Sequence, residues 1–201
     1  MDDSQLAPKQ ARSFKSQRKI LDATLSLLEE QHFENVTIAD IAASADMAVG
    51  NFYKRFKNKE ALLPHLYAEY NLRFREFSET IQANPTDDPW LKIVSETVAF
   101  FEANKGIIRA LHLHSRLNPT LVPIGSTTSR AGLYQSLEQL VTQIGLNSAT
   151  RKRRARAAAL VMVSTITEAI LYPEMTPHAA SGLSKRQLTR ELVDVLKSYC
   201  T

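Results

Sequence analysis

The chain has 201 residues, 44% of them hydrophobic and 23% charged, and its 25 Lys and Arg residues exceed its 21 Asp and Glu residues to give a net charge of +4. A chain of this length and composition forms one domain, or one domain with a small appendage, and is not globally disordered. The single cysteine, Cys200, excludes a disulfide framework and a cysteine-based zinc site, and the longest apolar run, residues 157–163, is far too short to span a membrane.

The low content of turn-forming residues favours helices. The sequence has 6 Gly and 8 Pro, and few segments alternate apolar with polar residues as the strands of a sandwich or barrel do. Residues 1–20 are polar and charged and lack the apolar segment of a secretory signal. We therefore expect an all-α protein of about nine helices, located in the cytoplasm, with no membrane partner and no cofactor.

The N-terminal part is predicted to hold four helices. Residues 1–13 lack hydrophobic periodicity and are expected to form an arm. Thr37 is a typical N-cap residue, and Asp40 lies three positions later, where it can complete a capping box. Asn58 is a second N-cap candidate. The predicted helices are residues 14–31, 37–44, 48–56 and 59–83.

Prolines at positions 85 and 89 mark a loop, after which five further helices are expected. One of them begins with a strongly basic segment, residues 151–156, and becomes apolar on nearly all sides. The basic segment is either a solvated helix start or a second nucleic-acid contact. The predicted helices are residues 90–104, 106–117, 127–144, 150–171 and 184–200.

Two short helices joined by the turn Ala45-Asp46-Met47 have the spacing of a helix-turn-helix. Ala42 is small, as required where two helices cross closely. The turn needs a residue that tolerates the left-handed conformation, which Asp46 does, although less well than glycine. Basic clusters without acidic residues flank this motif at residues 9–19 and 54–59.

Helices of this kind enter the major groove of DNA by their N-terminal residues. Small side chains at Ala48 and Gly50 would allow close approach, and the Asn51 amide can both donate to and accept from a base edge. Tyr53, Lys54 and Lys59 suit phosphate groups. The alternative is an ordinary three-helix cap with a solvated basic edge. The predicted DNA-binding residues are Thr37, Ala48, Val49, Gly50, Asn51, Tyr53, Lys54 and Lys59.

The segment from Arg18 to Leu63 resembles the TetR family of bacterial transcriptional regulators. The resemblance rests on Arg18-x-Ile20-Leu21-x-Ala23, Phe33, Thr37-Ile38-x-Asp40-Ile41-Ala42, Ala45 and Gly50-Asn51-Phe52-Tyr53-x-x-Phe56-x-x-Lys59-Glu60-x-Leu62, in unbroken order. Two positions depart from the family pattern. Asp46 stands where the turn usually has glycine, and Ala48 stands where a serine often caps the second helix of the motif.

The resemblance implies a DNA-binding domain over residues 1–63 and a helical effector-binding and dimerisation domain over residues 64–201. It also implies a homodimer that binds a near-palindromic double-stranded operator, most often as a repressor released by a small molecule. An activator, or a helical interaction protein without an effector, remains the alternative. No nucleophile with a base, carboxylate pair or phosphate-binding glycine loop is recognisable, so we do not expect an enzyme.

The last two predicted helices are the expected dimer interface. Residues 150–171 are too apolar all round for the surface of a monomer. Residues 184–200 carry a seam that is either interface or plain core. Arg or Glu at Val161 or Leu192 is therefore expected to produce monomers. The members of the seam are Leu188, Leu192, Val195 and Tyr199.

An effector pocket is expected within residues 90–170, for a hydrophobic ligand with one polar end. Glu168 lies in an otherwise apolar stretch and would need a partner or a ligand. His112 and His114 are two positions apart on a helix and cannot easily bind one metal ion, so no metal site is expected. Apolar residues of this kind are more often simply core, which is the favoured alternative for any one of them. The pocket candidates are Trp90, Phe100, Phe101, His112, Arg116, Tyr134, Met162 and Glu168.

Overall fold

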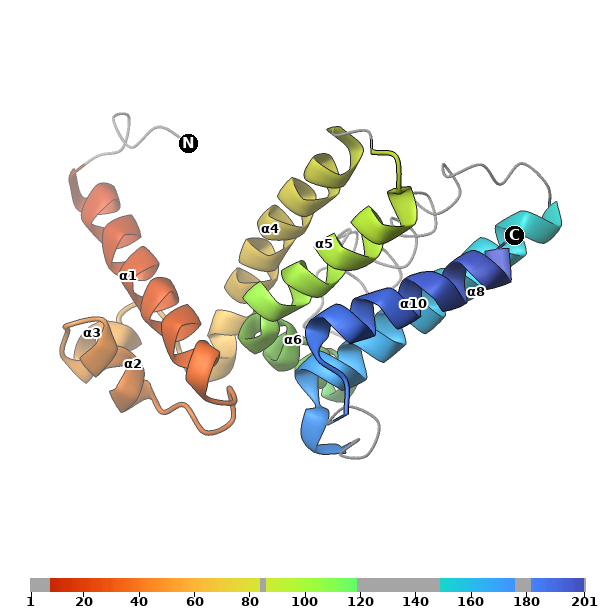
Figure 1. Ribbon diagram of the computed structural model, residues 1–201. Helices are drawn as coiled ribbons and strands as arrows, with labels where there is room; N and C mark the ends of the chain where they lie inside the picture. The colour runs from red at the N-terminus through yellow and green to blue at the C-terminus, as the bar shows by residue number, and fades with distance from the viewer. Residues whose placement is uncertain (1–7, 84–85, 119–148, 176–181, 201) are drawn as a thin grey trace. The chain divides into compact units, whose positions relative to one another are not determined.

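The computed structural model describes residues 8–83, 86–118, 149–175 and 182–200. All regular structure in these ranges is helical and contains no strand, which confirms the all-α prediction. The arm at residues 1–7 and the helix expected over residues 127–144 lie outside the described residues. The α-helices, drawn in Figure 1, are α1 (Pro8–Glu30), α2 (Ile38–Ser44), α3 (Val49–Tyr53), α4 (Leu63–Ala83), α5 (Pro89–Ala103), α6 (Lys105–Leu117), α8 (Ala149–Ile166) and α10 (Lys185–Cys200).

Two predicted boundaries were wrong. Helix α1 begins at Pro8, so part of the expected arm is helical. Proline is favoured in the first turn of a helix, and polar helix-forming residues add no hydrophobic period by which the extension could be recognised. Helix α3 ends at Tyr53, ahead of the expected residue 56. The segment expected to be helical to residue 171 is helical to that point, as α8 is followed after Ile166 by a π-helix, Thr167–Leu171.

The described residues gather into two compact units. Residues 8–69 and 106–118 form unit 1, and residues 70–83, 86–105, 149–175 and 182–200 form unit 2. Helix α6 therefore groups with the N-terminal helices, whereas the domain boundary expected from the sequence fell after residue 63. Within unit 1, α2 packs against α1 and α3 (Figure 1).

The core of unit 1 explains how these short helices stay in place. Its largest fully buried side chains come from α1, the loop after it, α2, α3, the segment entering α4 and the start of α4, and they are Ile20, Leu28, Phe33, Ile41, Phe52, Leu62, Leu63 and Leu66. Helix α6 approaches α1 so closely that a Cβ at Gly106 would lie 2.0 Å from the carbonyl oxygen of Leu28. The hydroxyl of Tyr67 also donates to the carbonyl of Leu111 at 3.2 Å.

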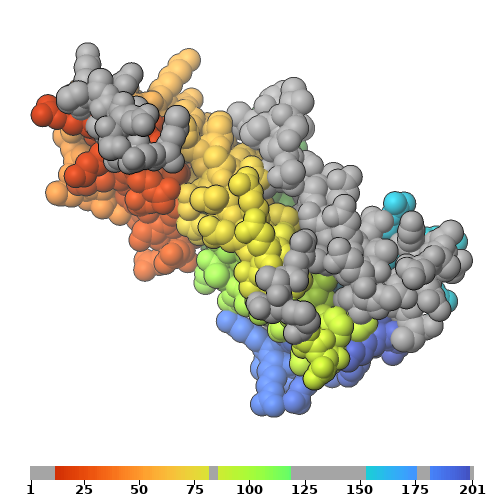
Figure 2. All heavy atoms as spheres, turned by 90° about the horizontal axis from the view of Figure 1, so that it is seen from above, coloured from red at the N-terminus to blue at the C-terminus, as the bar shows by residue number. Residues whose placement is uncertain are grey.

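Unit 2 is held by an antiparallel pair of helices, α5 and α10. Asp88 caps α5 by accepting from the Leu91 amide at 3.1 Å, and Lys197 Nζ donates to the other oxygen of Asp88 at 2.8 Å. The hydrogen bond from Lys197, and to a smaller extent the one from the Leu91 amide, hold the pKa of Asp88 below its ordinary value. Lys185 pairs with Glu102 at 2.9 Å near the opposite end of α5. Figure 2 shows α10 atoms, in blue, beside α5 atoms, in yellow-green.

Candidate DNA-binding surface

The predicted capping box opens α2 and is confirmed. The Thr37 amide and hydroxyl both donate to Asp40 Oδ2, at 2.9 and 2.6 Å, and the Asp40 amide donates back to Thr37 Oγ1 at 3.1 Å. The hydroxyl and then the amide of Thr37 lower the pKa of Asp40. The ionised Asp40 therefore stabilises the folded state at pH values above the ordinary carboxyl pKa. This stabilisation is lost as the pH falls through the lowered pKa.

The turn between α2 and α3 has the conformation expected from the sequence. Asp46 has φ of 52° and is the only residue other than glycine with positive φ among the described residues. The turn is closed by the Met47 amide, which donates to the carbonyl of Ala42 at 2.9 Å. An aspartate adopts this left-handed region at lower cost than most side chains, which explains how the turn forms without glycine.

Helix α3 is anchored by one buried residue and exposes the rest of its surface. Phe52 is completely buried, whereas Val49 and Tyr53 are 41% and 56% exposed. Gly50, Asn51 and Lys54 are also exposed. A Cβ added to Gly50 would meet nothing within 4 Å, so the α3 backbone can be approached closely there. The surface predicted to contact DNA is therefore accessible, while its contact with DNA remains a prediction.

Ala48 is the N-cap of α3, and it provides no side-chain hydrogen bond to the helix. This is the consequence expected of an alanine in place of the serine that often stands at this position in the family. The amides of the first turn of α3 consequently lack a side-chain acceptor at that residue.

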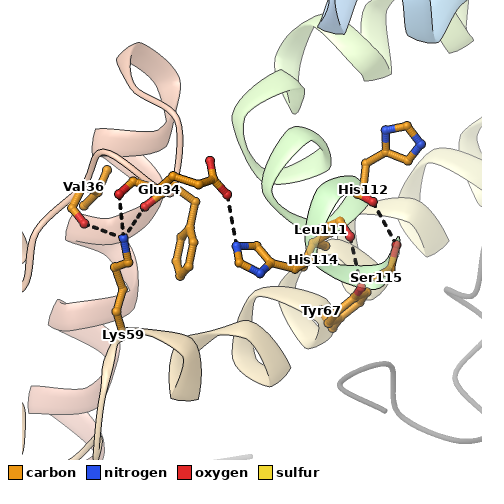
Figure 3. A network of polar contacts seen from close by, with 9 residues as sticks. Glu34, Val36, Lys59, Tyr67, Leu111, His112, His114 and Ser115 are labelled. Carbon is orange, nitrogen blue, oxygen red and sulfur yellow. Dashed lines mark hydrogen bonds and ion pairs between the residues drawn. The ribbon is translucent and has the colours of Figure 1, made fainter. Parts of the chain in front are cut away.

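The ammonium group of Lys59, predicted to contact a phosphate, makes internal hydrogen bonds in the structure. Its Nζ donates to the carbonyls of Phe33, Glu34 and Val36, at 2.6, 3.1 and 2.9 Å (Figure 3). An ammonium group has three hydrogens, so these contacts use its full donor capacity. These contacts favour a structural role for Lys59, because the loop between α1 and α2 turns its carbonyls towards this side chain, and the phosphate contact stays a prediction.

The same loop is held from α6 by a second basic group. His114 Nε2 lies 3.1 Å from Glu34 Oε1 (Figure 3). The His114 ring meets the Phe33 ring edge-on with centroids 5.0 Å apart, and Lys59 Nζ lies 4.8 Å from the centroid of Phe33. Sequence reasoning did not find this cluster, because Phe33, Lys59 and His114 are far apart in the chain and no local pattern joins them.

Exposed positive charge lies on α1 and on the residues that follow α3. Lys54, Arg55 and Lys57 are exposed, as are Lys15 and Lys19 on α1. Arg18, in the first basic cluster, is instead engaged with Asp22 at 2.8 Å and with Glu69 at 3.0 Å. Within the described ranges, no group of three or more His, Cys, Asp or Glu residues could hold a metal ion.

The predicted effector residues are not all in one unit. Trp90, Phe100, Phe101 and Met162 are buried in unit 2, while the half-buried His112 and the exposed Arg116 belong to unit 1. Glu168 is exposed, so the burial cost that was expected to demand a partner or a ligand does not arise. Tyr134 lies outside the described residues. Phe100 packs against an aromatic cluster of Tyr70, Phe74 and Phe77.

The predicted interface helices expose part of their apolar surface. Leu160 and Val161 on α8 are 53% and 45% exposed, and Val195 and Tyr199 on α10 are 54% and 47% exposed. Leu192 is only 5% exposed, because it belongs to the face that α10 turns towards α5 and α8. The seam predicted on α10 is therefore divided between the core of unit 2 and the exposed surface.

Comparisons with known proteins agree with this arrangement. Residues 20–66 match the model of a family described as "Bacterial regulatory proteins, tetR family". The chain is 24% identical over 108 residues to the "Probable HTH-type transcriptional regulator YttP" of Bacillus subtilis (strain 168). That alignment spans 52% of the chain and 52% of the relative, so about half the length of each is matched.

Two solved structures share the fold over most of the chain. A bacterial regulatory protein in the TetR family from Rhodococcus RHA1 has a TM-score of 0.64 at 20% identity, covering 92% of this chain and 97% of that one. FadR from Bacillus subtilis, in complex with stearoyl-CoA, has a TM-score of 0.57 at 21% identity, covering 92% and 97%. Among the described residues, no helix has the length and apolar character needed to cross a membrane.

Proposed function

We propose that the chain is a TetR-family transcriptional regulator, and that it is a repressor which binds a near-palindromic operator as a homodimer and is released by a small hydrophobic molecule. The match of residues 20–66 to the model of that family supports the proposal. The observation that carries the DNA-binding part is the exposed face of α3. A completely buried Phe52 and a closed turn fix this helix, while its remaining side chains are free to enter a major groove.

Dimerisation is supported by the exposed apolar side chains of α8 and α10. Four large apolar residues on these two helices are between 45% and 54% exposed. A symmetric pairing of both helices would cover these surfaces around a two-fold axis. Two copies of α3 would then address successive major grooves about 34–36 Å apart, or at a multiple of that distance.

The proposed effector is a small molecule that binds in the helical part of the chain following the helix-turn-helix. It is supported by the buried aromatic side chains of unit 2 and by the fold shared with FadR, a regulator that was determined with stearoyl-CoA. A ligand weakens operator binding only to the extent that it prefers the conformation that does not bind DNA. We propose a ligand with a long apolar part and one polar end.

Operator binding is tested by selecting duplexes from a random library with the full chain and measuring affinity by fluorescence anisotropy. We expect selected duplexes to bind at least about 1,000-fold more tightly than random duplexes at physiological salt, and affinity to fall steeply as salt rises. Equal affinity for selected and random duplexes would contradict the proposal.

In the same assay, stearoyl-CoA and a panel of apolar metabolites should release the DNA. If no compound changes affinity or thermal stability, the effector part is wrong.

The dimer is tested with Val161→Glu, which places a charge on the exposed apolar surface of α8. We expect monomers in sedimentation velocity at micromolar concentration and loss of tight operator binding, because each monomer retains only one recognition helix. The matched control is Leu91→Glu, at a residue of α5 that is 43% exposed. Leu192 is unsuitable for this test because its charged variants would disrupt the core of unit 2. A Val161→Glu protein that remains dimeric would refute this interface.

A further inference from the structure

An exposed side chain of α3 is bonded to the side chain of the residue that caps the C-terminal end of the helix. Lys54 Nζ donates to Asn51 Oδ1 at 3.1 Å. The residues are three positions apart, which places them on the same face of a helix. An ammonium group can only donate, so the Asn51 amide turns its oxygen towards Lys54 and its NH2 group away. The hydrogen-bonding character of this surface is therefore set by the pair and not by Asn51 alone.

This pairing changes which base the surface complements. A free asparagine amide suits adenine, because it can accept from N6 and donate to N7 at the same time. When Lys54 uses one of the two lone pairs of the Asn51 oxygen, the pair presents mainly N–H donors to a base, from the Asn51 amide and the Lys54 ammonium, and the ammonium beside that oxygen disfavours the approach of a second amino group. Guanine presents two acceptors, N7 and O6, in the major groove, whereas adenine and cytosine each present an amino donor there.

We propose that Asn51 and Lys54 act together to select guanine over adenine at one base pair of each half-site. The inference rests on the proposed function, since it requires α3 to lie in the major groove. It gives Lys54 a role in sequence selection instead of the phosphate contact predicted from the sequence. Gly50 favours the close approach that this contact needs, because the space beside its Cα is open.

Other groups near the pair do not supply the same contact. Arg55, the next cation along the chain, donates to the carbonyl of Lys54 at 3.4 Å. Lys57 lies in the loop after α3 and is exposed. Lys59 is committed to three carbonyls of the loop before α2. The Asn51–Lys54 pair is thus the array of N–H donors that α3 and its C-cap residue carry together.

The test compares base preferences of the wild-type full chain and three variants by selection from a random duplex library. Each preferred duplex and its single-base substitutions are then measured by fluorescence anisotropy. Asn51→Ala locates the base pair, because preference should disappear there. At that base pair we expect the wild type to favour guanine over adenine about ten-fold. Lys54→Met should shift the preference towards adenine, because the Asn51 oxygen is released. Lys57→Met removes an equal charge and should keep the guanine preference.

Each result bears on the proposal. A Lys54→Met protein that loses affinity for all duplexes by one common factor, and still prefers guanine, would show a phosphate contact and overturn the inference. A wild-type preference for adenine, or no base pair sensitive to Asn51→Ala, would also overturn it. Failure of the wild type to prefer any duplex would refute the proposed function itself. Circular dichroism melting confirms that each variant is folded at the assay temperature.

Discussion

We expect Lys59→Met to lower the midpoint of thermal unfolding by roughly 6–12 °C, corresponding to about 3 kcal/mol. Methionine keeps the length of the side chain but removes all three hydrogen bonds to the carbonyls of Phe33, Glu34 and Val36. Hydrogen bonds from a charged group contribute more than neutral ones, and their loss leaves part-buried carbonyls without this donor. Differential scanning fluorimetry or calorimetry measures the change.

The control for this variant is Lys57→Met, which removes the same charge from an exposed residue two positions earlier and should shift the midpoint little. The dependence of DNA affinity on salt separates a structural role from a phosphate contact. Loss of a phosphate contact would reduce the slope of log affinity against log salt by about one. A Lys59→Met protein with wild-type stability and such a reduced slope would restore the role that the structure argues against.

Gly106→Ala is expected to destabilise the chain by a net of about 2–3 kcal/mol, which is roughly 5–10 °C in the unfolding midpoint. The new Cβ would lie 2.0 Å from the carbonyl oxygen of Leu28 and 2.5 Å from its carbonyl carbon. Both are backbone atoms of α1, so the clash cannot be relieved by rotating a side chain, and α6 must move. The higher helix propensity of alanine recovers at most about 1 kcal/mol.

Gly182→Ala is the matched control, because a Cβ at that position would meet nothing within 4 Å. We expect its unfolding midpoint to stay close to that of the wild type. If Gly106→Ala unfolds at the same temperature as Gly182→Ala, then α6 does not make the close approach to α1 on which unit 1 depends.

The helix-turn-helix could be predicted in detail because its determinants are local. A capping box forms between residues three positions apart, so Thr37 and Asp40 could be paired from the sequence, and the structure has this pair. The positive φ of Asp46 follows from the spacing between two short helices and the few residue types that tolerate that conformation. The missing side-chain cap at Ala48 is likewise a property of one residue at one position.

Long-range contacts decided what local patterns could not. A lysine after an N-cap residue looks available for a phosphate, and only the folded loop shows that Lys59 is used internally. The apolar period of α10 identifies a buried face but cannot distinguish core from interface, and packing against α5 and α8 placed Leu192 in the core. Val195 and Tyr199 were left exposed by the same packing.

The sequence by itself determined that this protein is helical and carries a helix-turn-helix, because hydrophobic period, caps and turn residues act over a few positions along the chain. Only the tertiary structure decided that α6 packs with the N-terminal helices and that one loop is bound by both Lys59 and His114. These contacts join residues distant in the chain. Their energies depend on burial and on which donors and acceptors meet, and neither is fixed until the helices have packed.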